Sequence, residues 1–160
     1  MAWTTPPTWV VGEDIPAADL QILSDNGNPT FASYTPSWTA STANPAIGNG
    51  TIAGAYWQAG KLVHFRASIT MGTTTTYGTG TWQLSLPVTP KSNGRLPAVG
   101  TFADISAGSV YEARLYWTST TTAVMAYLGA SGLYTAVTST APFTWASTDV
   151  VALEGWYEAA

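Results

Sequence analysis

The chain lacks cysteine and carries little charge. Its 160 residues include five Lys and Arg, nine Asp and Glu and one His, so 9% of residues are charged, against roughly 25% in an average soluble domain. The absence of cysteine excludes disulfide scaffolds, thiol nucleophiles and zinc sites built on thiolates. With so few charges, the surface must consist largely of hydroxyls, amides and backbone. Such a surface suits a protein that works outside the cytoplasm or inside a larger assembly.

The sequence lacks the features that nucleic-acid binding and membrane insertion require. The five cations are scattered along the chain and form no basic stripe, so we expect no nucleic-acid partner. No run approaches the roughly 20 apolar residues that span a bilayer, so we expect no membrane insertion. The first residues also lack the basic and apolar regions of a secretory signal peptide.

Groups suited to catalysis or metal binding are few. His64 is the single histidine, so no His pair can hold a metal, and an exposed or interface position is the alternative to a general base. A glycosidase needs two facing carboxylates. Asp104 and Glu112 flank one hairpin and could approach each other, and Asp149 and Glu154 bracket the last strand. Surface positions, and turn amides for Asp149, explain them more simply. We therefore expect no enzymatic activity, no cofactor and no metal site.

Residues 1–33 differ in pattern from the rest of the chain. Acidic residues and Pro16 precede a short apolar run, which predicts a helix of about two turns that begins at the proline. The stretch 26–29, Asn-Gly-Asn-Pro, is a stop signal. A helix this short is unstable alone, so its apolar residues need a surface to bury against. We interpret 1–33 as an anchor and linker with the contact residues Trp3, Trp9, Ile15, Leu20 and Leu23.

Residues 34–160 have the pattern of a β domain. Thr, Val, Tyr and Trp dominate, and turn signals recur at a spacing of roughly 8–12 residues. We expect an all-β fold, namely an antiparallel jelly-roll-like β-sandwich of about eight strands. The Thr-rich run 73–80 is expected to be a hairpin tip. The strands are expected at 34–42, 51–59, 61–71, 80–87, 97–105, 109–118, 121–128 and 149–158, with another short one near 133–138.

Alternation assigns the faces of the strands. In 61–71, the odd-numbered positions from Val63 to Met71 are apolar and predict the core face. In the last strand, the face that carries Val151 and Leu153 is the core face. The opposite face is half apolar, which an ordinary solvent face does not need. A subunit interface explains it, with a covering loop as the alternative, and its candidate residues are Val150, Ala152 and Trp156.

Eight Trp and eight Tyr could supply stacking platforms for sugars, because aromatic rings offer flat apolar faces. Four of them fall on strand positions that predict the core: Trp38, Trp82, Trp117 and Tyr157. Core or interface filling remains the alternative for every other aromatic residue. A carbohydrate-binding module without catalysis is therefore the second functional hypothesis. Its candidate contacts with a glycan or a host surface are Trp57, Tyr77, Tyr134 and Trp145.

Two parts of the chain resemble virion proteins of actinobacterial phages. The run 3–13, followed by Ala17-Ala18 and a Leu-bearing helix, resembles the leader of small tail-associated proteins. Those leaders often have arginine in place of Pro7, and their helix usually continues through a stretch of which 24–26 keeps only part. The β domain resembles phage fibre heads at 34–40, 44–51, 79–87 and 142–158, where Pro-Phe-Thr-Trp leads to Gly-Trp-Tyr-Glu.

The resemblance implies a structural protein of the phage virion, commonly a homotrimer and usually without enzymatic activity or a cofactor. Residues 1–33 would attach to other virion proteins, and residues 34–160 would be displayed on the exposed surface of the particle, where the head can contact a host surface glycan. A tail-fibre or minor-tail position follows from the leader. A capsid decoration or head-fibre position follows from the small size and the absence of heptad or collagen-like shaft repeats. Both positions stay open.

Overall fold

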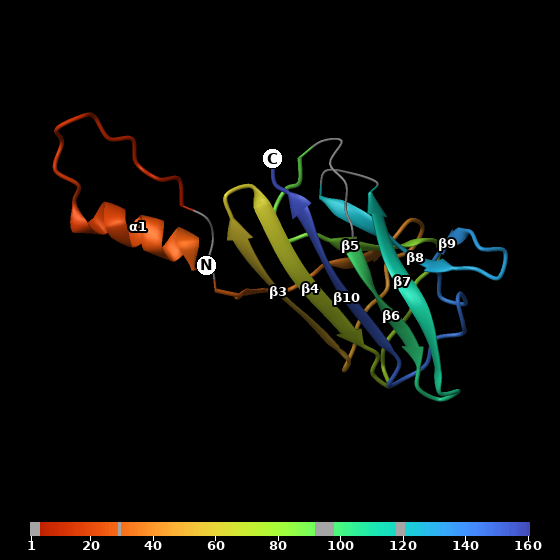
Figure 1. The fold of residues 1–160 in the computed structure, drawn as a ribbon. Helices are drawn as coiled ribbons and strands as arrows, with labels where there is room; N and C mark the ends of the chain where they lie inside the picture. The colour runs from red at the N-terminus through yellow and green to blue at the C-terminus, as the bar shows by residue number, and fades with distance from the viewer. Residues whose placement is uncertain (1–3, 29, 92–97, 118–120) are drawn as a thin grey trace.

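The chain comprises an N-terminal arm and a β head. The computed structural model describes residues 4–28, 30–91, 98–117 and 121–160. We call residues 4–31 the arm and residues 32–160 the head. The arm stands off to one side of the sheet and joins it through β1 (Figure 1). The sheet begins at Ala32, two residues before the start of the expected head.

The arm contains one helix, α1 (Ala17–Gly27), of 11 residues. It is a turn longer than expected, and Pro16 occupies the N-cap rather than the first helical position. The extended lead folds back along the helix: Trp9 Nε1 donates to Asp19 Oδ2 at 3.0 Å. Further along, Thr4 and Asn26 exchange hydrogen bonds of 3.2 and 2.7 Å. The arm is therefore held by its own contacts.

The described residues of the head form one antiparallel sheet. Its order is β1-β3-β4-β10-β6-β7-β8-β5-β2, with β9 paired to β8. The strands are β1 (Ala32–Tyr34), β2 (Trp38–Ala40), β3 (Thr51–Ala59), β4 (Leu62–Thr70), β5 (Trp82–Ser85), β6 (Ala98–Asp104), β7 (Ser109–Trp117), β8 (Thr122–Leu128), β9 (Tyr134–Ala136) and β10 (Val150–Glu158). The all-β fold with a short helix is confirmed. The jelly-roll interpretation stays a prediction.

The expected strand 34–42 is two short strands separated by residues 35–37. Pro36 lies between them, and proline both lacks an N–H for a ladder and restrains the residue before it. β1 and β2 occupy opposite edges of the sheet. Because the three linking residues can span at most about 14 Å, the two edges must approach each other. The sheet is therefore curled.

The hydrophobic core lies inside the curled sheet, on the strand faces that alternation assigns. The odd-numbered residues of β4 and β10 are buried, as expected. Trp38, Trp82 and Tyr157 are buried, which confirms three expected core aromatics, while the Trp117 side chain lies outside the described residues. The rings of Trp38 and Trp82 meet edge to face, with centroids 4.6 Å apart.

The run 73–80 is a crossover rather than a hairpin tip. It connects β4 to β5, which are not neighbours in the sheet. Along the way it pairs with the segment before β3, through the bridges Ala43↔Thr79 and Ala46↔Thr76. Its threonines bond to that segment, because the Thr75 hydroxyl donates to the Ile47 carbonyl oxygen. The repeated threonines of this run supply hydroxyl groups that form hydrogen bonds with the backbone of the neighbouring segment.

Candidate functional site

The outer face of the sheet carries a groove of about 580 Å³ that crosses β1, β3, β4, β10 and β6. Its floor is made of small residues, chiefly Ala53, Ala55 and Ala152, which leave the backbone of Gly54 and Gly100 accessible. Hydroxyl and charged side chains surround this floor: Ser33, Arg66, Ser68, Thr101 and Glu154.

Strand register explains the shape of the groove. Ala53 lies opposite Ser68, and Ser68 lies opposite Ala152, so small side chains line up across three strands. β6 runs close to β10 because position 100 is glycine. A Cβ atom at Gly100 would lie 1.9 Å from the carbonyl oxygen of Ala152.

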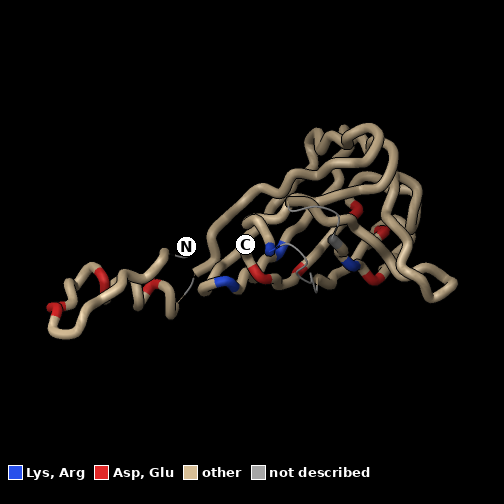
Figure 2. The backbone as a smooth tube through the Cα atoms, turned by 90° about the horizontal axis from the view of Figure 1, so that it is seen from above, with Lys and Arg blue, Asp and Glu red and all other residues tan. Residues whose placement is uncertain are grey.

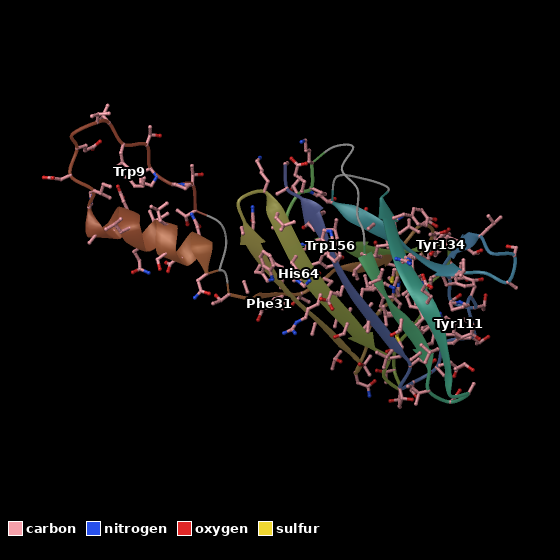
Figure 3. All side chains as sticks on the ribbon, viewed as in Figure 1. Trp9, Phe31, His64, Tyr111, Tyr134 and Trp156 are labelled. Atoms are coloured by element: carbon pink, nitrogen blue, oxygen red, sulfur yellow. The ribbon has the colours of Figure 1, made fainter. Side chains whose placement is uncertain are left out.

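Aromatic rings lie at one end of the groove. Phe31, His64 and Trp156 lie together on the outer side of the sheet, where the arm joins the head (Figure 3). With Trp57 they form what we call the aromatic cluster. The Trp57 and His64 rings stack at 5.5 Å, and Phe31 meets His64 edge to face at 5.8 Å. Phe31 and Trp156 remain 46% and 53% exposed, so both can accept a ligand.

Two charged side chains join the cluster to the groove. The Arg66 guanidinium lies 4.7 Å from the centre of the Phe31 ring, as a cation–π contact. His64 Nε2 lies 3.0 Å from Glu154 Oε1. In the part of the chain that the structure describes, His64 Nδ1 is buried without a hydrogen-bond partner. Arg66 and Glu154 face each other in the register of β4 and β10. The groove therefore offers donors, acceptors and ring faces side by side.

The carboxylate pair Asp149 and Glu154 does not form a facing pair. Asp149 is fully buried, where its Oδ2 and Oδ1 accept hydrogen bonds from the backbone N–H groups of Ala146 at 2.7 Å and Ile105 at 3.0 Å. This confirms its role as a turn residue. Glu154 lies on the opposite, outer face with His64. The two carboxylates that bracket the last strand therefore do not meet across a site.

Asp104 and Glu112 are also separated. Glu112 lies opposite Thr101 in the β6–β7 ladder, three residues from Asp104 along β6 and on the other face. Asp104 Oδ1 accepts from the Ser106 hydroxyl at 2.8 Å, while Glu112 binds Arg114 at 2.7 Å. Neither pair of carboxylates is arranged for acid–base catalysis across a sugar.

The four expected glycan contacts are dispersed. Trp145 is 3% exposed and its Nε1 donates to the Thr138 carbonyl oxygen, so the expectation of a surface position is wrong. Tyr77 is half-buried and stacks on Trp82, and its burial raises the pKa of the phenol. Tyr134 is exposed on β9, away from the groove (Figure 3). Trp57 alone of the four belongs to the aromatic cluster.

Tyr134 has a structural partner of its own. Its hydroxyl accepts from Arg114 Nε at 3.0 Å and donates to Glu112 Oε1 at 3.1 Å. The hydrogen bond with Tyr134, followed by that with Glu112, raises the pKa of Arg114. This exposed ring therefore covers an ion pair on the outer face of β7.

The three candidate interface residues share the outer face of β10, as alternation predicts. Ala152 lies in the groove, Trp156 stands at its aromatic end, and Val150 lies beyond it, opposite Thr70. Sequence reasoning missed Phe31 and Arg66, and it considered Glu154 only as a carboxylate paired with Asp149. Their sequence signal was weak, because only the register of β3, β4 and β10 brings them together.

The anchor candidates are exposed in the arm. Ile15, Leu20 and Leu23 are 48%, 52% and 39% exposed. Trp9 is half-buried against Asp19. Trp3 lies outside the described residues. The arm therefore presents apolar side chains that it does not cover itself.

Comparison with protein-family models, curated proteins and solved structures gives no match for this chain. Among the described residues, no cluster of three His, Asp or Glu side chains could hold a metal ion. No helix in the described part of the chain is both long and apolar enough to cross a bilayer.

Proposed function

We propose that this chain is a structural protein of a phage particle, attached by its arm and displaying its β head on the particle surface. The observation that carries the proposal is the arm itself. It folds on its own contacts beside the head, yet leaves Ile15, Leu20 and Leu23 open to solvent. Full burial of one such side chain stabilises a complex by about 1.5–3 kcal/mol. The resemblance of the leader and head to virion proteins is the reason for proposing a phage particle as the assembly.

The distribution of charge between arm and head indicates what kind of surface the arm would bind. Four of the nine acidic residues, Glu13, Asp14, Asp19 and Asp25, lie in the arm, which has no Lys or Arg. The other five acidic residues equal the five cations, all of which lie in the head. Figure 2 shows acidic residues alone along the arm and both signs on the head. The arm therefore suits an apolar pocket with a basic rim on another particle protein.

Incorporation into particles tests the attachment. Deleting residues 1–28 should leave a folded head, because this segment lies outside the sheet, but should remove the protein from purified particles. A finer test is the double variant Leu20→Ser with Leu23→Ser. Losing two leucines that the proposed contact would bury should lower incorporation by at least about tenfold. Immunoblots of particles give the copy number, and circular dichroism checks the fold of the head.

The matched control is Gln21→Ser, which changes an exposed polar residue on the same helix. It should leave incorporation unchanged. If particles retain the head after deletion of residues 1–28, the proposed attachment is refuted. If Gln21→Ser reduces incorporation as much as the leucine variant, the effect belongs to helix stability rather than to apolar contact.

The homotrimer and the position on tail or capsid are separate proposals. A trimer lets small heads share buried area through a closed ring of contacts. Light scattering on the purified full chain measures its mass directly. A mass of three chains is expected, and a monomer at high micromolar concentration would refute a trimer that forms before attachment.

A further inference from the structure

We infer that the groove binds a neutral saccharide, with the rings of Trp156 and Phe31 as platforms and Arg66 and Glu154 as hydrogen-bonding partners. This inference goes beyond the proposed attachment and does not depend on it. It concerns the outer face of the head, whereas attachment concerns the arm.

The shape fits a small ligand. At about 580 Å³, the groove falls within the roughly 300–1,000 Å³ typical of ligand sites. Alanine, glycine and serine supply most of its floor. An ordinary outer face of a sheet carries long polar side chains, which would fill this volume. The run of small residues across three strands keeps it open.

The aromatic cluster supplies ring faces in fixed positions. Trp156 is 53% exposed, which leaves its ring accessible beside the groove. Phe31 is positioned by its contacts with the His64 ring and the Arg66 guanidinium, and 46% of its surface stays exposed. A side chain fixed before binding loses little conformational freedom when a ligand arrives. The C–H faces of a sugar ring are apolar and match such flat surfaces.

The polar groups favour an uncharged, hydroxyl-rich ligand. Arg66 offers donors, Glu154 offers acceptors, and Ser68 and Thr101 offer both. The opposite charges of Arg66 and Glu154 face each other across β4 and β10, so neither sign prevails in the groove. A phosphate or nucleic-acid ligand would need an excess of cations, which the head lacks.

A subunit contact on the same face is the competing use. Packed interfaces need complementary shapes, and a hollow of this size must be filled by a protrusion from the partner. A sugar fills the hollow without one. The two uses exclude each other, so one set of variants distinguishes them.

The experiment uses the purified full chain on an array of neutral oligosaccharides built from glucose, galactose, mannose, rhamnose and arabinose. Binding to at least one class is expected. The strongest array member is then titrated by calorimetry against Trp156→Ala, Glu154→Gln and Ser68→Trp. Ser68 is exposed on the outer face, so the added indole should fill the groove without disturbing the core. Each variant should weaken binding by at least about tenfold.

The control is Tyr134→Ala, which removes a ring of similar exposure outside the groove and should leave affinity unchanged. Near-ultraviolet circular dichroism checks that each variant is folded. Glu154→Gln keeps the shape of its side chain and serves if Ser68→Trp fails to fold. The inference is overturned if no array member binds, or if Tyr134→Ala abolishes binding while Trp156→Ala does not. It is also overturned if Ser68→Trp dissociates an oligomer.

Discussion

The buried hydroxyl groups of Tyr157 and Tyr34 differ in their hydrogen bonding, and we expect them to affect stability in opposite directions. The Tyr157 hydroxyl donates to the Val88 carbonyl oxygen at 2.8 Å and accepts from the Val88 N–H at 3.0 Å. The Tyr34 hydroxyl is buried without a partner among the described residues, while its ring packs against Gly54. A buried polar group without a hydrogen bond costs free energy. The two hydroxyls therefore have opposite effects on stability.

Removing each hydroxyl tests this difference. Tyr34→Phe should leave the free energy of unfolding unchanged or raise it by about 1 kcal/mol, because it removes an unsatisfied group. Tyr157→Phe should lower it by about 1–3 kcal/mol, because both polar groups of Val88 lose their partner. Urea denaturation measures both values. The reverse order would count against the hydrogen-bond assignments.

The same tyrosines predict a loss of stability in alkali. Burial raises the pKa of Tyr34 and of Tyr157 above the ordinary value of 10.0, with a smaller contribution from a neighbouring tyrosine in each case. The unfolded chain therefore releases these protons first as the pH rises. The stability linked to them is complete below pH 10 and is lost as the pH rises through the folded-state values.

Denaturant midpoints measured from neutral pH to above pH 10 check this linkage. We expect the denaturant midpoint to decline from about pH 10 upward. The decline should be shallower in Tyr34→Phe, because this variant lacks one of the two tyrosines linked to stability. An alkaline decline of equal slope in this variant would show that Tyr34 is not one of the groups responsible.

Residue roles were predictable where local chemistry sets them. Asp149 was expected to bond amides in its own turn, and its Oδ2 does so at Ala146. Its bond to Ile105, in the turn between β6 and β7, had no local signal. Trp145 was misplaced because it lies between strands, where no alternation assigns a face. Its ring is buried by contacts from distant parts of the chain, including Trp82 at 4.9 Å and Phe102 at 5.9 Å.

At the scale of elements, β10 organises the head. It lies between β4 and β6 and pairs with both over long stretches. The bounds of β3 and β10 were predictable to within a residue, since turn residues and alternation mark them. The order of the strands in the sheet was not predictable from the sequence, because pairing between strands far apart in the chain leaves no local signal. The groove is a product of that order.

Gly100 tests the close approach of β6 and β10. Gly100→Ala would place a Cβ atom 1.9 Å from the Ala152 carbonyl oxygen, so the strands must separate. We expect the free energy of unfolding to fall by about 1–3 kcal/mol, as for other overpacked sites. Thermal or urea denaturation measures this.

Gly27→Ala is the control for Gly100→Ala, since a Cβ atom at Gly27 meets nothing within 4 Å. It should not destabilise the chain. Equal stability of Gly100→Ala and the unchanged chain would mean that β6 and β10 are not held at this distance.

For the whole molecule, the division of charge between arm and head has a measurable consequence. The arm has four carboxylates and no cation, so a basic-rimmed partner would attract it through screened electrostatic forces. Attachment should weaken as ionic strength rises from about 0.01 M to about 1 M, over which the screening length falls from about 30 Å to about 3 Å. Salt titration of purified particles measures the fraction of protein released. If the released fraction does not depend on salt, the electrostatic part of the proposed contact is refuted and only the apolar part remains.

The proposed attachment to a phage particle is tested most directly by electron microscopy of particles assembled with this chain, with and without residues 1–28. Intact particles should show density for the β head projecting from the surface of the tail or capsid, joined to another particle protein through the arm. Particles of the deletion variant should lack that density. Identical density in both would contradict attachment by the arm, and absence of the protein from intact particles would contradict the structural role.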